Sequence, residues 1–283
     1  MKNPFGLTGK GIGIAFLDTG IFPHIDFDSR ILCFRDFLFG GRRPYDDNGH
    51  GTHTAGIASA SGRGRGGGWS GVAPGSGIIA LKVLDRRGNG QKRDVLRAMD
   101  WLLVNQEKYG IRIVNISVGT TEQNPELHEA LIRGVEKLWD AGLHVVTAAG
   151  NMGPEPGSVT APGSSRKVIT VGSSDMLVER QGVSGRGPTR DCVCKPDLVT
   201  PGYEILSCAP GGDGRRYARK SGTSMSTPFV SGGIALLLEK DPRLTNLDIK
   251  KRLRTTAKDL GYPHNLQGWG LFQLQNFLNG SGT

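Results

Sequence analysis

Three residues of this chain, Asp18, His50 and Ser224, have the types that nucleophilic catalysis by serine requires. A serine hydroxyl is a weak nucleophile near neutral pH, so it needs a base that accepts its proton, and the base needs a carboxylate that fixes its tautomer. Asp18 precedes Thr-Gly, His50 lies between two glycines, and Ser224 lies between Gly-Thr and Met. These observations predict an Asp–His–Ser triad that forms an acyl-enzyme. Taken alone, Asp18 also fits a turn and Ser224 a helix cap.

The segment around Ser224 indicates where negative charge on a reacting carbonyl would be held. The sequence Gly-Thr-Ser-Met-Ser-Thr-Pro at 222–228 is followed by a helix-like run at 229–240, so Ser224 is expected at a helix start. Free backbone N–H groups and the positive end of the helix dipole lie at such a position and stabilise an oxyanion. Pro228 is expected in the first turn, where its missing N–H costs little.

His50 and His53 are three residues apart, a spacing that raises the question of a metal site. No Cys/His pair with zinc spacing follows them, and no Glu occupies the position that an HExxH site requires, so the sequence disfavours zinc. We expect His50 to be the exposed base and His53 to be a packed structural histidine.

The elements that must position these residues alternate along the chain. Apolar runs predict strands at 12–17, 78–83, 112–116, 143–148 and 168–172. Helix-like stretches are expected at 50–59, 92–107, 125–140, 223–239 and 246–254, with apolar stripes of helical period in the second and third and Thr245 capping the last. This alternation predicts an α/β fold of three layers, in which a mostly parallel sheet carries helices on both faces. Asp18 would then lie at the carboxyl edge of the sheet, where ligands bind in such folds.

Bulk properties set limits on the domain organisation and the partners. The 283 residues suit a single catalytic domain over residues 1–283. No run of eighteen apolar residues is present, so no membrane span is expected. The net charge is +9, but the basic residues are scattered and no nucleic-acid motif accompanies them. We therefore expect a solvated basic surface, no nucleic-acid or membrane partner, and a monomer.

The motifs together resemble those of a known protease family. Asp-Thr-Gly at 18–20, His-Gly-Thr-His at 50–53 and the segment 222–228 are similar to the three catalytic motifs of subtilisin-like serine proteases, the subtilase or peptidase S8 family. The resemblance extends over nearly the whole chain. It implies a subtilisin-like fold, a serine endopeptidase activity and protein or peptide substrates. It also implies that Asn151, in Ala-Ala-Gly-Asn at 148–151, donates to the oxyanion together with the Ser224 N–H.

Two further segments, Tyr-Asp-Asp-Asn-Gly-His at 45–50 and Arg-Gly-Pro at 186–188, resemble the bacterial AprX-like branch of this family. The family usually carries an N-terminal propeptide that assists folding and blocks the cleft. Because the first core strand starts near Gly11 and residues 1–6 lack an apolar signal segment, we expect no propeptide in this chain. The expected location is cytoplasmic, or outside the cell if the N-terminus has been trimmed.

The resemblance also implies where a substrate would lie. Its backbone would pair as an added strand between two segments, one formed by Gly88, Asn89 and Gly90 and the other by Ser117, Val118 and Gly119. P1 is the substrate residue before the scissile bond. One wall of its pocket would be the segment 117–119, and the other would be Ala148, Ala149 and Gly150, with Thr160 near the base. None of these residues is a carboxylate, so we expect apolar or aromatic P1 residues. A peptide-binding pseudoprotease and a peptide ligase or cyclase are the alternatives.

The requirement for metal ions is a separate question. Many relatives bind calcium in a loop that here reads Ser-Gly-Arg-Gly-Arg-Gly-Gly-Gly at 61–68, and two arginines oppose a calcium ion. Asp26 matches a family ligand position without an evident site to complete. A weaker site for calcium or sodium is left open at the backbone carbonyls of Gly163, Ser165 and Val168. No cofactor is expected to be required.

The four cysteines, Cys33, Cys192, Cys194 and Cys208, are too sparse and clustered for a disulfide scaffold. Free thiols are expected, as in a reducing compartment. Two disulfides, or a metal site at Cys192, Cys194 and Cys208 that lacks an obvious fourth ligand, are the alternatives.

Overall fold

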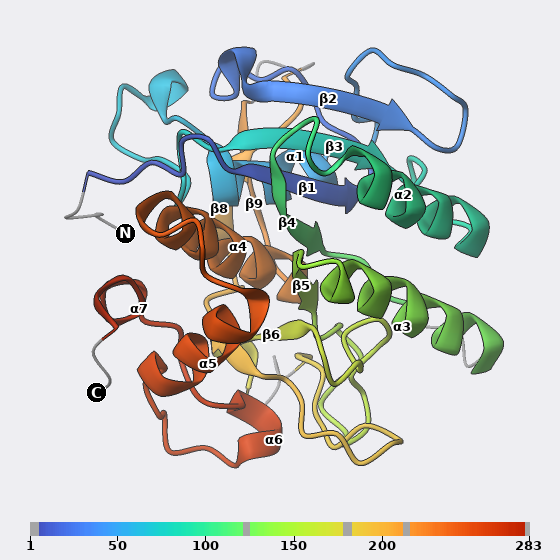
Figure 1. Ribbon diagram of the computed structural model, residues 1–283, viewed down its shortest axis with the longest axis vertical. Helices are drawn as coiled ribbons and strands as arrows, with labels where there is room; N and C mark the ends of the chain where they lie inside the picture. The colour runs from blue at the N-terminus through green and yellow to red at the C-terminus, as the bar shows by residue number, and fades with distance from the viewer. Residues whose placement is uncertain (1–5, 121–124, 178–182, 212–215, 281–283) are drawn as a thin grey trace.

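A seven-stranded parallel sheet runs through the centre of the molecule (Figure 1). The structure is a computed structural model, and it describes residues 6–120, 125–177, 183–211 and 216–280. The strand order is β2-β3-β1-β4-β5-β6-β7, and each neighbouring pair is parallel. The strands are β1 (Gly13–Asp18), β2 (Ile31–Asp36), β3 (Gly77–Lys82), β4 (Ile111–Ile116), β5 (His144–Ala148), β6 (Ile169–Ser173) and β7 (Leu198–Thr200).

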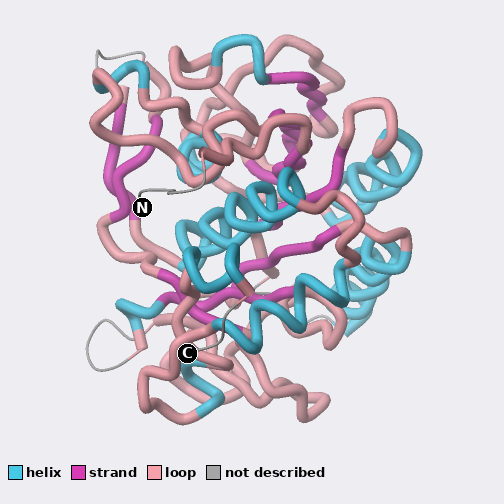
Figure 2. Tube along the Cα trace, turned by 60° about the vertical axis from the view of Figure 1, so that its left-hand side comes forward, coloured by secondary structure: helices cyan, strands magenta, loops and turns pink. Residues whose placement is uncertain are grey.

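Helices cover the sheet in two groups. Helices α1 (His50–Ser59) and α4 (Thr223–Lys240) pack together, with α1 against β1 and β3 and α4 against β4, β5 and β6. Helices α2 (Lys92–Asn105) and α3 (Pro125–Asp140) pack together, and α3 contacts β5. Figure 1 shows α2 and α3 in front of the sheet and α1 behind it, and the turned view in Figure 2 shows strands lying between helices. The α/β class and the three layers predicted from the sequence are confirmed.

Shorter elements complete the fold. Strands β8 (Ile205–Cys208) and β9 (Tyr217–Lys220) form a separate antiparallel pair. The C-terminal part contains α5 (Asn246–Thr256), α6 (His264–Gln267) and α7 (Leu274–Asn279). Short 3-10 turns occur at Asp28–Arg30, Arg63–Arg65 and Ser174–Met176. Thr245 caps α5 through a capping box with Asp248, as the sequence predicted.

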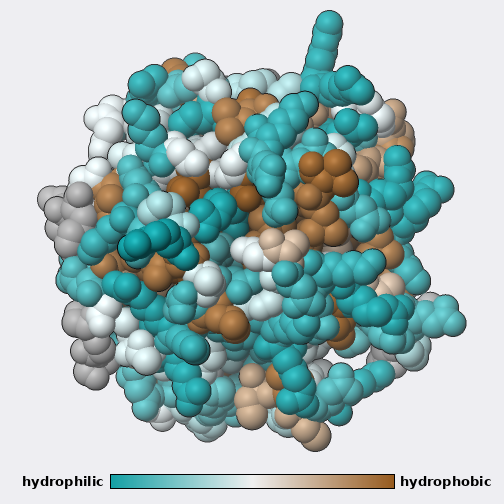
Figure 3. Space-filling model, in the orientation of Figure 1, coloured by the Kyte–Doolittle hydropathy of each residue, from teal (hydrophilic) through white to brown (hydrophobic). Residues whose placement is uncertain are grey.

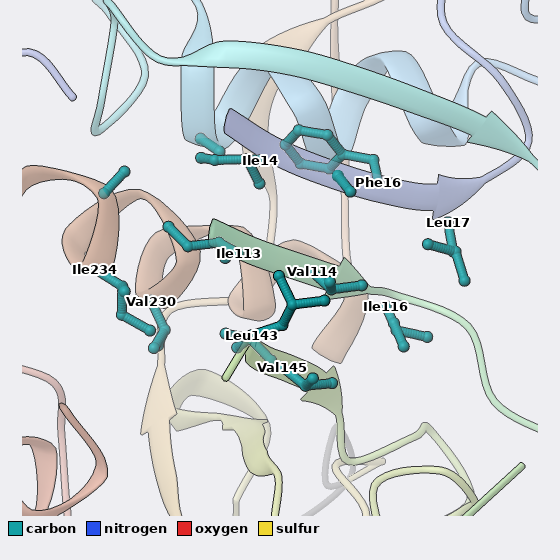
Figure 4. Packing of buried hydrophobic residues seen from close by; sticks show 14 of the residues in the cluster. Ile14, Phe16, Leu17, Ile113, Val114, Ile116, Leu143, Val145, Val230 and Ile234 are labelled. Carbon is teal, nitrogen blue, oxygen red and sulfur yellow. The ribbon is translucent and has the colours of Figure 1, made fainter. Parts of the chain in front are cut away.

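The core lies on both sides of the parallel strands. Every residue of β1, β5 and β6 is buried, which explains why these strands read as continuous apolar runs rather than as alternating patterns. Figure 4 shows part of this core, with Ile113 of β4 close to Val230 and Ile234 of α4. Helix α4 is buried over most of its length, so it packs against these strands as part of the core.

The sequence analysis missed four strands for identifiable reasons. β2 is an edge strand in which only Phe34 and Asp36 are buried, and it carries Arg35 and Asp36. β7 has only three residues. β8 and β9 belong to the separate antiparallel pair, in which the polar residues Arg219 and Lys220 weaken the apolar signal. β2 and β7 pair with strands that lie further away in the sequence, β3 and β6, whereas β8 and β9 are close in the sequence and pair with each other.

The surface and the cysteines add three facts. On the face drawn in Figure 3, hydrophilic residues cover most of the surface and apolar residues form separate patches between them. Among the described residues, no helix has both the length and the apolar character needed to cross a membrane. Cys33, Cys192, Cys194 and Cys208 form no disulfide, and among the described residues Cys208 does not come together with Cys192 and Cys194 as a metal site would require, which agrees with the expected free thiols.

Candidate active site

The residues singled out for chemistry meet at the carboxyl edge of the sheet. Asp18 is the last residue of β1, His50 the first of α1 and Ser224 the second of α4. The His50 ring nitrogen Nδ1 lies 2.7 Å from the Asp18 carboxylate oxygen Oδ1. Asp18 is buried, whereas the His50 side chain is 25% exposed. The histidine therefore has one nitrogen held by a buried carboxylate and a ring that is accessible from the cleft.

The Asp18 carboxylate is held by neighbours of its own. Its Oδ1 atom accepts the backbone N–H of Thr19 at 2.7 Å, and its Oδ2 atom accepts the hydroxyl of Thr54 at 3.2 Å. Burial alone would lower the pKa of His50, but the charge of Asp18 and its hydrogen bond outweigh burial and raise that pKa above its usual value. An imidazolium at position 50 is therefore stabilised by the protein.

Asp46 positions the start of the helix that carries His50, a role that the sequence analysis missed. Its Oδ1 atom accepts the N–H of Gly49 at 2.7 Å and the hydroxyl of Thr19 at 2.9 Å. Its Oδ2 atom accepts both the N–H and the hydroxyl of Thr52, at 2.9 and 2.6 Å. One carboxylate thus connects the residue after Asp18 to the first turn of α1. An aspartate just before a helix start was the available signal.

Lys82, at the end of β3, is a second residue that the sequence analysis missed. Its side chain is fully buried, and its ammonium donates to the carbonyls of Thr19 and Leu84 at 2.6 and 2.9 Å. The same ammonium group also donates to the Asp47 carboxylate at 2.7 Å. The lysine thereby links the backbone next to Asp18 to the start of the loop that leads to Gly88. A lysine inside the apolar run 78–83 was the signal for it.

Ser224 exchanges two hydrogen bonds with Ser117. The Ser224 hydroxyl donates to the Ser117 carbonyl at 2.8 Å, and the Ser117 hydroxyl donates to the Ser224 carbonyl at 3.2 Å. Rotation about the Cα–Cβ bond of Ser224 is needed to direct its proton to His50, and such catalytic hydrogen bonds often tighten only when substrate binds.

The expectation for Pro228 was wrong. Helix α4 begins at Thr223, so Pro228 is the sixth helical residue and lies beyond the first turn. A proline there removes the N–H that would bond to the carbonyl four residues earlier, which is that of Ser224. The hydroxyl of Ser117 satisfies this carbonyl instead. The proline is tolerated because a residue from β4's carboxyl end replaces the missing donor.

Asn151 lies next to the start of α4. Its side-chain oxygen accepts the backbone N–H of Thr223 at 3.0 Å and the Thr223 hydroxyl at 3.1 Å. The same hydroxyl accepts the N–H of Gly150 at 3.1 Å. With its oxygen occupied, the amide presents its N–H₂ group to the cleft side. Gly222 has φ +142°, and a Cβ there would lie 3.2 Å from the Asn151 amide nitrogen, so glycine leaves the amide unobstructed.

These groups open onto one cleft of about 1130 Å³. His50, Asn151, Thr223 and Ser224 line it. So do nine of the expected substrate-binding residues, namely Gly88, Asn89, Gly90, Ser117, Val118, Gly119, Ala148, Gly150 and Thr160. Ala149 does not, because it is fully buried and both of its backbone groups are used, the N–H by Val171 and the carbonyl by Thr160.

His53 is the packed structural histidine that the sequence predicted. Its side chain is buried, and its Nε2–H donates to the carbonyls of Ile205 and Ala218 at 3.0 and 3.1 Å. Burial lowers its pKa to about 4, so the ring stays neutral at ordinary pH. It joins α1 to β8 and β9 and does not face the cleft.

The surroundings of Asp26 do not fit a calcium ion. The carboxylate accepts the Gly64 N–H at 2.8 Å and the Tyr217 hydroxyl at 2.9 Å, and Ser61 and Cys208 lie beside it as further donors. Calcium needs several free oxygen ligands, whereas protein donors surround this carboxylate. His24, Asp26 and Cys208 are close enough to be considered for a metal. The Nδ1 atom of His24, however, already accepts the N–H of Asp26.

The expected weak cation site is likewise lined by groups that are in use. The Gly163 carbonyl accepts the hydroxyl of Thr170 at 2.6 Å. The Val168 carbonyl accepts two lysine ammonium groups, from Lys195 at 2.9 Å and Lys250 at 2.8 Å. Ser165 has its hydroxyl bound to Glu136 at 2.8 Å. With two ammonium groups already on the Val168 carbonyl, this set of carbonyls does not fit a further cation.

Comparison with known proteins identifies the family. The model of the Subtilase family, Peptidase_S8, matches residues 9–270. The chain belongs to the subtilase family. It is 36% identical to serine protease AprX of Bacillus subtilis, over 99% of this chain and 69% of that protein. It is also 36% identical to subtilisin Savinase of Lederbergia lenta, over 94% of this chain and 90% of that protein.

Solved structures of subtilases agree with this assignment. A psychrophilic protease, S41, superposes with a TM-score of 0.80 and 30% identity, covering 94% of this chain and 92% of its own. A cold-adapted subtilisin-like serine proteinase superposes with a TM-score of 0.76 and 29% identity, covering 95% of this chain and 89% of its own. The likeness to AprX-like subtilases predicted from residues 45–50 and 186–188 is confirmed. This subtilase is a serine endopeptidase that acts on proteins or peptides.

Proposed function

We propose that Ser224 is the nucleophile, His50 the general base and Asp18 the residue that orients His50. The observation that carries this assignment is the 2.7 Å contact between His50 and the buried Asp18 carboxylate, at a cleft that Ser224 also lines. A carboxylate on Nδ1 fixes the neutral tautomer in which Nε2 can accept a proton. The order of the three residues along the chain is the one found in subtilisin.

The reaction proceeds in two half-reactions. As Ser224 Oγ attacks the peptide carbonyl carbon, His50 accepts the hydroxyl proton and the carbonyl oxygen becomes an oxyanion. The Asn151 amide and the Ser224 N–H donate to that oxygen. The carbon–nitrogen bond breaks, the leaving amine takes the proton from His50, and an acyl-enzyme remains. Water then attacks the ester carbonyl, His50 accepts its proton and returns it to Ser224, and the acid product leaves.

The substrate backbone is expected to lie as an extended strand between the segments 88–90 and 117–119. Both segments line the same cleft as His50, Asn151 and Ser224. The Ser117 carbonyl is bound by the Ser224 hydroxyl in this structure, and this bond is released when the serine turns toward His50. Backbone pairing explains how one enzyme can accept many sequences, because main-chain groups are the same in all of them.

Apolar or aromatic P1 residues are expected because the pocket walls offer no carboxylate to a lysine or arginine. Thr160 lies between the two walls: a Cβ on Gly119 or on Gly150 would come within 2.4 Å of its hydroxyl oxygen. That oxygen is buried and has no hydrogen-bond partner in the part of the chain that the structure describes. Thr160 therefore limits the depth of the pocket and leaves one polar atom at its base.

Active-site labelling tests the assignment of the nucleophile. A fluorophosphonate probe should label the wild-type protein and should not label Ser224→Ala, and casein hydrolysis should disappear with the label. Ser221→Ala, a serine outside α4, is the matched control and should retain both. Labelling without casein cleavage would favour a peptide ligase or cyclase, which added amines would reveal by trapping the acyl group in preference to water. Unlabelled and inactive wild-type protein would instead indicate a pseudoprotease.

A peptide series that differs only at P1 tests the pocket. Phe, Leu and Met should give higher kcat/KM than Lys, Arg, Asp or Glu. Thr160→Gly should favour the largest side chains by deepening the pocket, whereas Thr160→Val keeps the volume and removes only the unpartnered hydroxyl. A preference for Lys or Arg in the wild type would contradict the expectation.

A further inference from the structure

The backbone segment 166–168 is bound by ammonium groups of the chain itself. Lys250, on α5, donates from its Nζ atom to three consecutive carbonyls, those of Arg166, Lys167 and Val168, at 2.9, 2.9 and 2.8 Å. An ammonium has three donors, and here all three reach backbone oxygens. Its side chain is 17% exposed. Several carbonyls turned toward one positive charge is the arrangement by which proteins also bind hard metal cations.

Lys195 brings a second ammonium to the same place. Its side chain is 1% exposed, and its Nζ atom donates to the Val168 carbonyl at 2.9 Å and to the Asp197 carboxylate at 2.6 Å. The second oxygen of Asp197 lies 3.5 Å from the Lys250 Nζ atom. The Asp197 carboxylate also accepts the N–H of Thr170 at 2.7 Å. A single carboxylate thus lies between two ammonium groups and the first residues of β6.

The charges of this cluster oppose a further cation. Lys195 and Lys250 contribute two positive charges and Asp197 one negative charge, so the cluster carries a net positive charge. A metal ion within a few ångströms would meet repulsion that is strong in a buried setting. The carbonyl of Val168 is already shared by both lysines. The site therefore offers a metal ion neither free ligands nor a favourable potential.

We propose that the ammonium of Lys250, supported by Lys195 and Asp197, takes the place of a bound metal ion at the carbonyls of residues 166–168. The segment it binds leads from Thr160, at the base of the P1 pocket, to β6. Strand β6 pairs with β5, which ends three residues before Asn151. Because this cation is part of the chain, it stabilises the wall of the cleft whatever the concentration of sodium, potassium or calcium in solution.

Melting temperatures provide the first test. All proteins carry Ser224→Ala, so self-cleavage does not contribute. Lys250→Met keeps an unbranched apolar stem and removes the charge. The double variant Lys195→Met/Lys250→Met removes both ammonium groups from the carbonyls of residues 166–168. The matched control is Lys251→Met, at an exposed position on the same helix. Each protein is melted with NaCl, KCl or CaCl₂ and with tetramethylammonium chloride at equal ionic strength, because the last cation is too large to be coordinated by the carbonyls.

The wild type and Lys251→Met should respond to the small cations no more than to tetramethylammonium. Lys250→Met should lose roughly 5–10 °C in Tm, and the double variant more, since unpaired buried groups are costly. At least one small cation should restore part of this loss with a saturating dose dependence. If no cation restores either variant, Lys250 is an ordinary ion-pair partner and the proposal fails. It also fails if the wild type shows the same saturable gain as the variants.

Terbium luminescence tests the same point without relying on stability. Tb³⁺ occupies calcium-type sites, and an ion replacing the Lys250 ammonium would lie near Trp139, whose ring centre is 5.7 Å from Nζ. The double variant should show saturable, tryptophan-sensitised emission that Trp139→Phe abolishes. The wild type should show no Trp139-dependent emission. Such emission from the wild type would mean that the site accepts a metal despite its lysines, and would overturn the proposal.

Discussion

The side-chain oxygen of Asn151 is held by Thr223 through two hydrogen bonds, one from the backbone N–H at 3.0 Å and one from the hydroxyl at 3.1 Å. Both bonds end on the same oxygen, so the amide cannot rotate without losing them. The N–H₂ group is therefore fixed in advance of any substrate. A donor that needs no reorientation during the reaction contributes fully to the transition state.

Replacing Asn151 with leucine should lower kcat by about 10²–10³-fold, the loss known for the corresponding donor in subtilisin, a relative of this chain. KM should change little, because the missing bond forms chiefly in the transition state. Steady-state kinetics on one peptide amide separates the two parameters. If KM rose in proportion while kcat stayed constant, Asn151 would be a ground-state binding residue.

Thr223→Val should give a smaller loss of kcat than Asn151→Leu. Valine keeps the backbone N–H that bonds to Asn151 and removes only the hydroxyl, which also accepts the Gly150 N–H. The double variant Asn151→Leu/Thr223→Val should be no slower than Asn151→Leu, since the hydroxyl acts through the amide. Additive losses would show that the Thr223 hydroxyl acts on its own.

The pH profile should report His50 and its partner Asp18. Catalysis needs neutral His50, and the carboxylate raises the pKa of His50 above 6.5, so wild-type activity should rise with pH through a midpoint above that value. Asp18→Asn removes the charge while burial, which lowers the pKa, persists. The midpoint of kcat/KM should therefore move to lower pH, with kcat reduced on the order of 10⁴-fold, as for other triads. An unchanged midpoint would exclude His50 as the titrating base.

Asp46 should contribute stability that disappears in acid. Burial alone would raise its pKa, but the hydrogen bonds from Thr52, Gly49 and Thr19 outweigh burial and lower it. The folded pKa is thus below the unfolded one, so the stabilisation is present above about pH 4 and is lost as the pH falls through the folded value. In a Ser224→Ala background, Asp46→Asn should lose roughly 1–3 kcal/mol at pH 7 by urea titration.

The same comparison at pH 3–4 provides the control for Asp46. Below about pH 4 the unfolded carboxylate takes up a proton that the folded one resists, so the wild type should lose part of its advantage and the two proteins should come closer together. Asp140→Asn, at an exposed ion pair with Lys167, should differ little from wild type throughout. A deficit for Asp46→Asn that is constant from pH 7 to pH 3 would mean that the ionised form has no special role.

Chelation with EGTA should lower the Tm of the wild type by only a small amount. The Asp26 carboxylate accepts the Gly64 N–H and the Tyr217 hydroxyl, so protein donors provide the contacts that calcium would otherwise make. Asp26→Asn should lower the Tm equally with EGTA and with calcium. A loss of tens of degrees in EGTA that calcium restores and magnesium does not would show that the loop 61–68 binds calcium after all.

Local patterns were sufficient for much of the fold and for the choice of chemical groups. The observed bounds of α1 and α3 match the predicted ones, α3 from its apolar stripe and α1 from a helix-like stretch of small residues, and the Thr245 cap was predicted from its residue type. The alternation of apolar runs with helices predicted the parallel sheet, since buried strands and amphipathic helices leave their signals in contiguous residues. Asp18, His50 and Ser224 were identified because small residues accompany them in short motifs.

Tertiary contacts decided what those motifs touch. The Ser117 hydroxyl that satisfies the Ser224 carbonyl comes from 107 residues away, and this long-range bond is what allows Pro228 to lie inside α4. Of the two lysines on the Val168 carbonyl, Lys250 comes from 82 residues away and Lys195 from 27. A carbonyl-rich segment looks the same in the sequence whether a metal or an ammonium binds it. The sequence determines which groups are available, whereas only the fold determines which charges and donors satisfy one another, because a hydrogen bond depends on distance in space and not on separation along the chain.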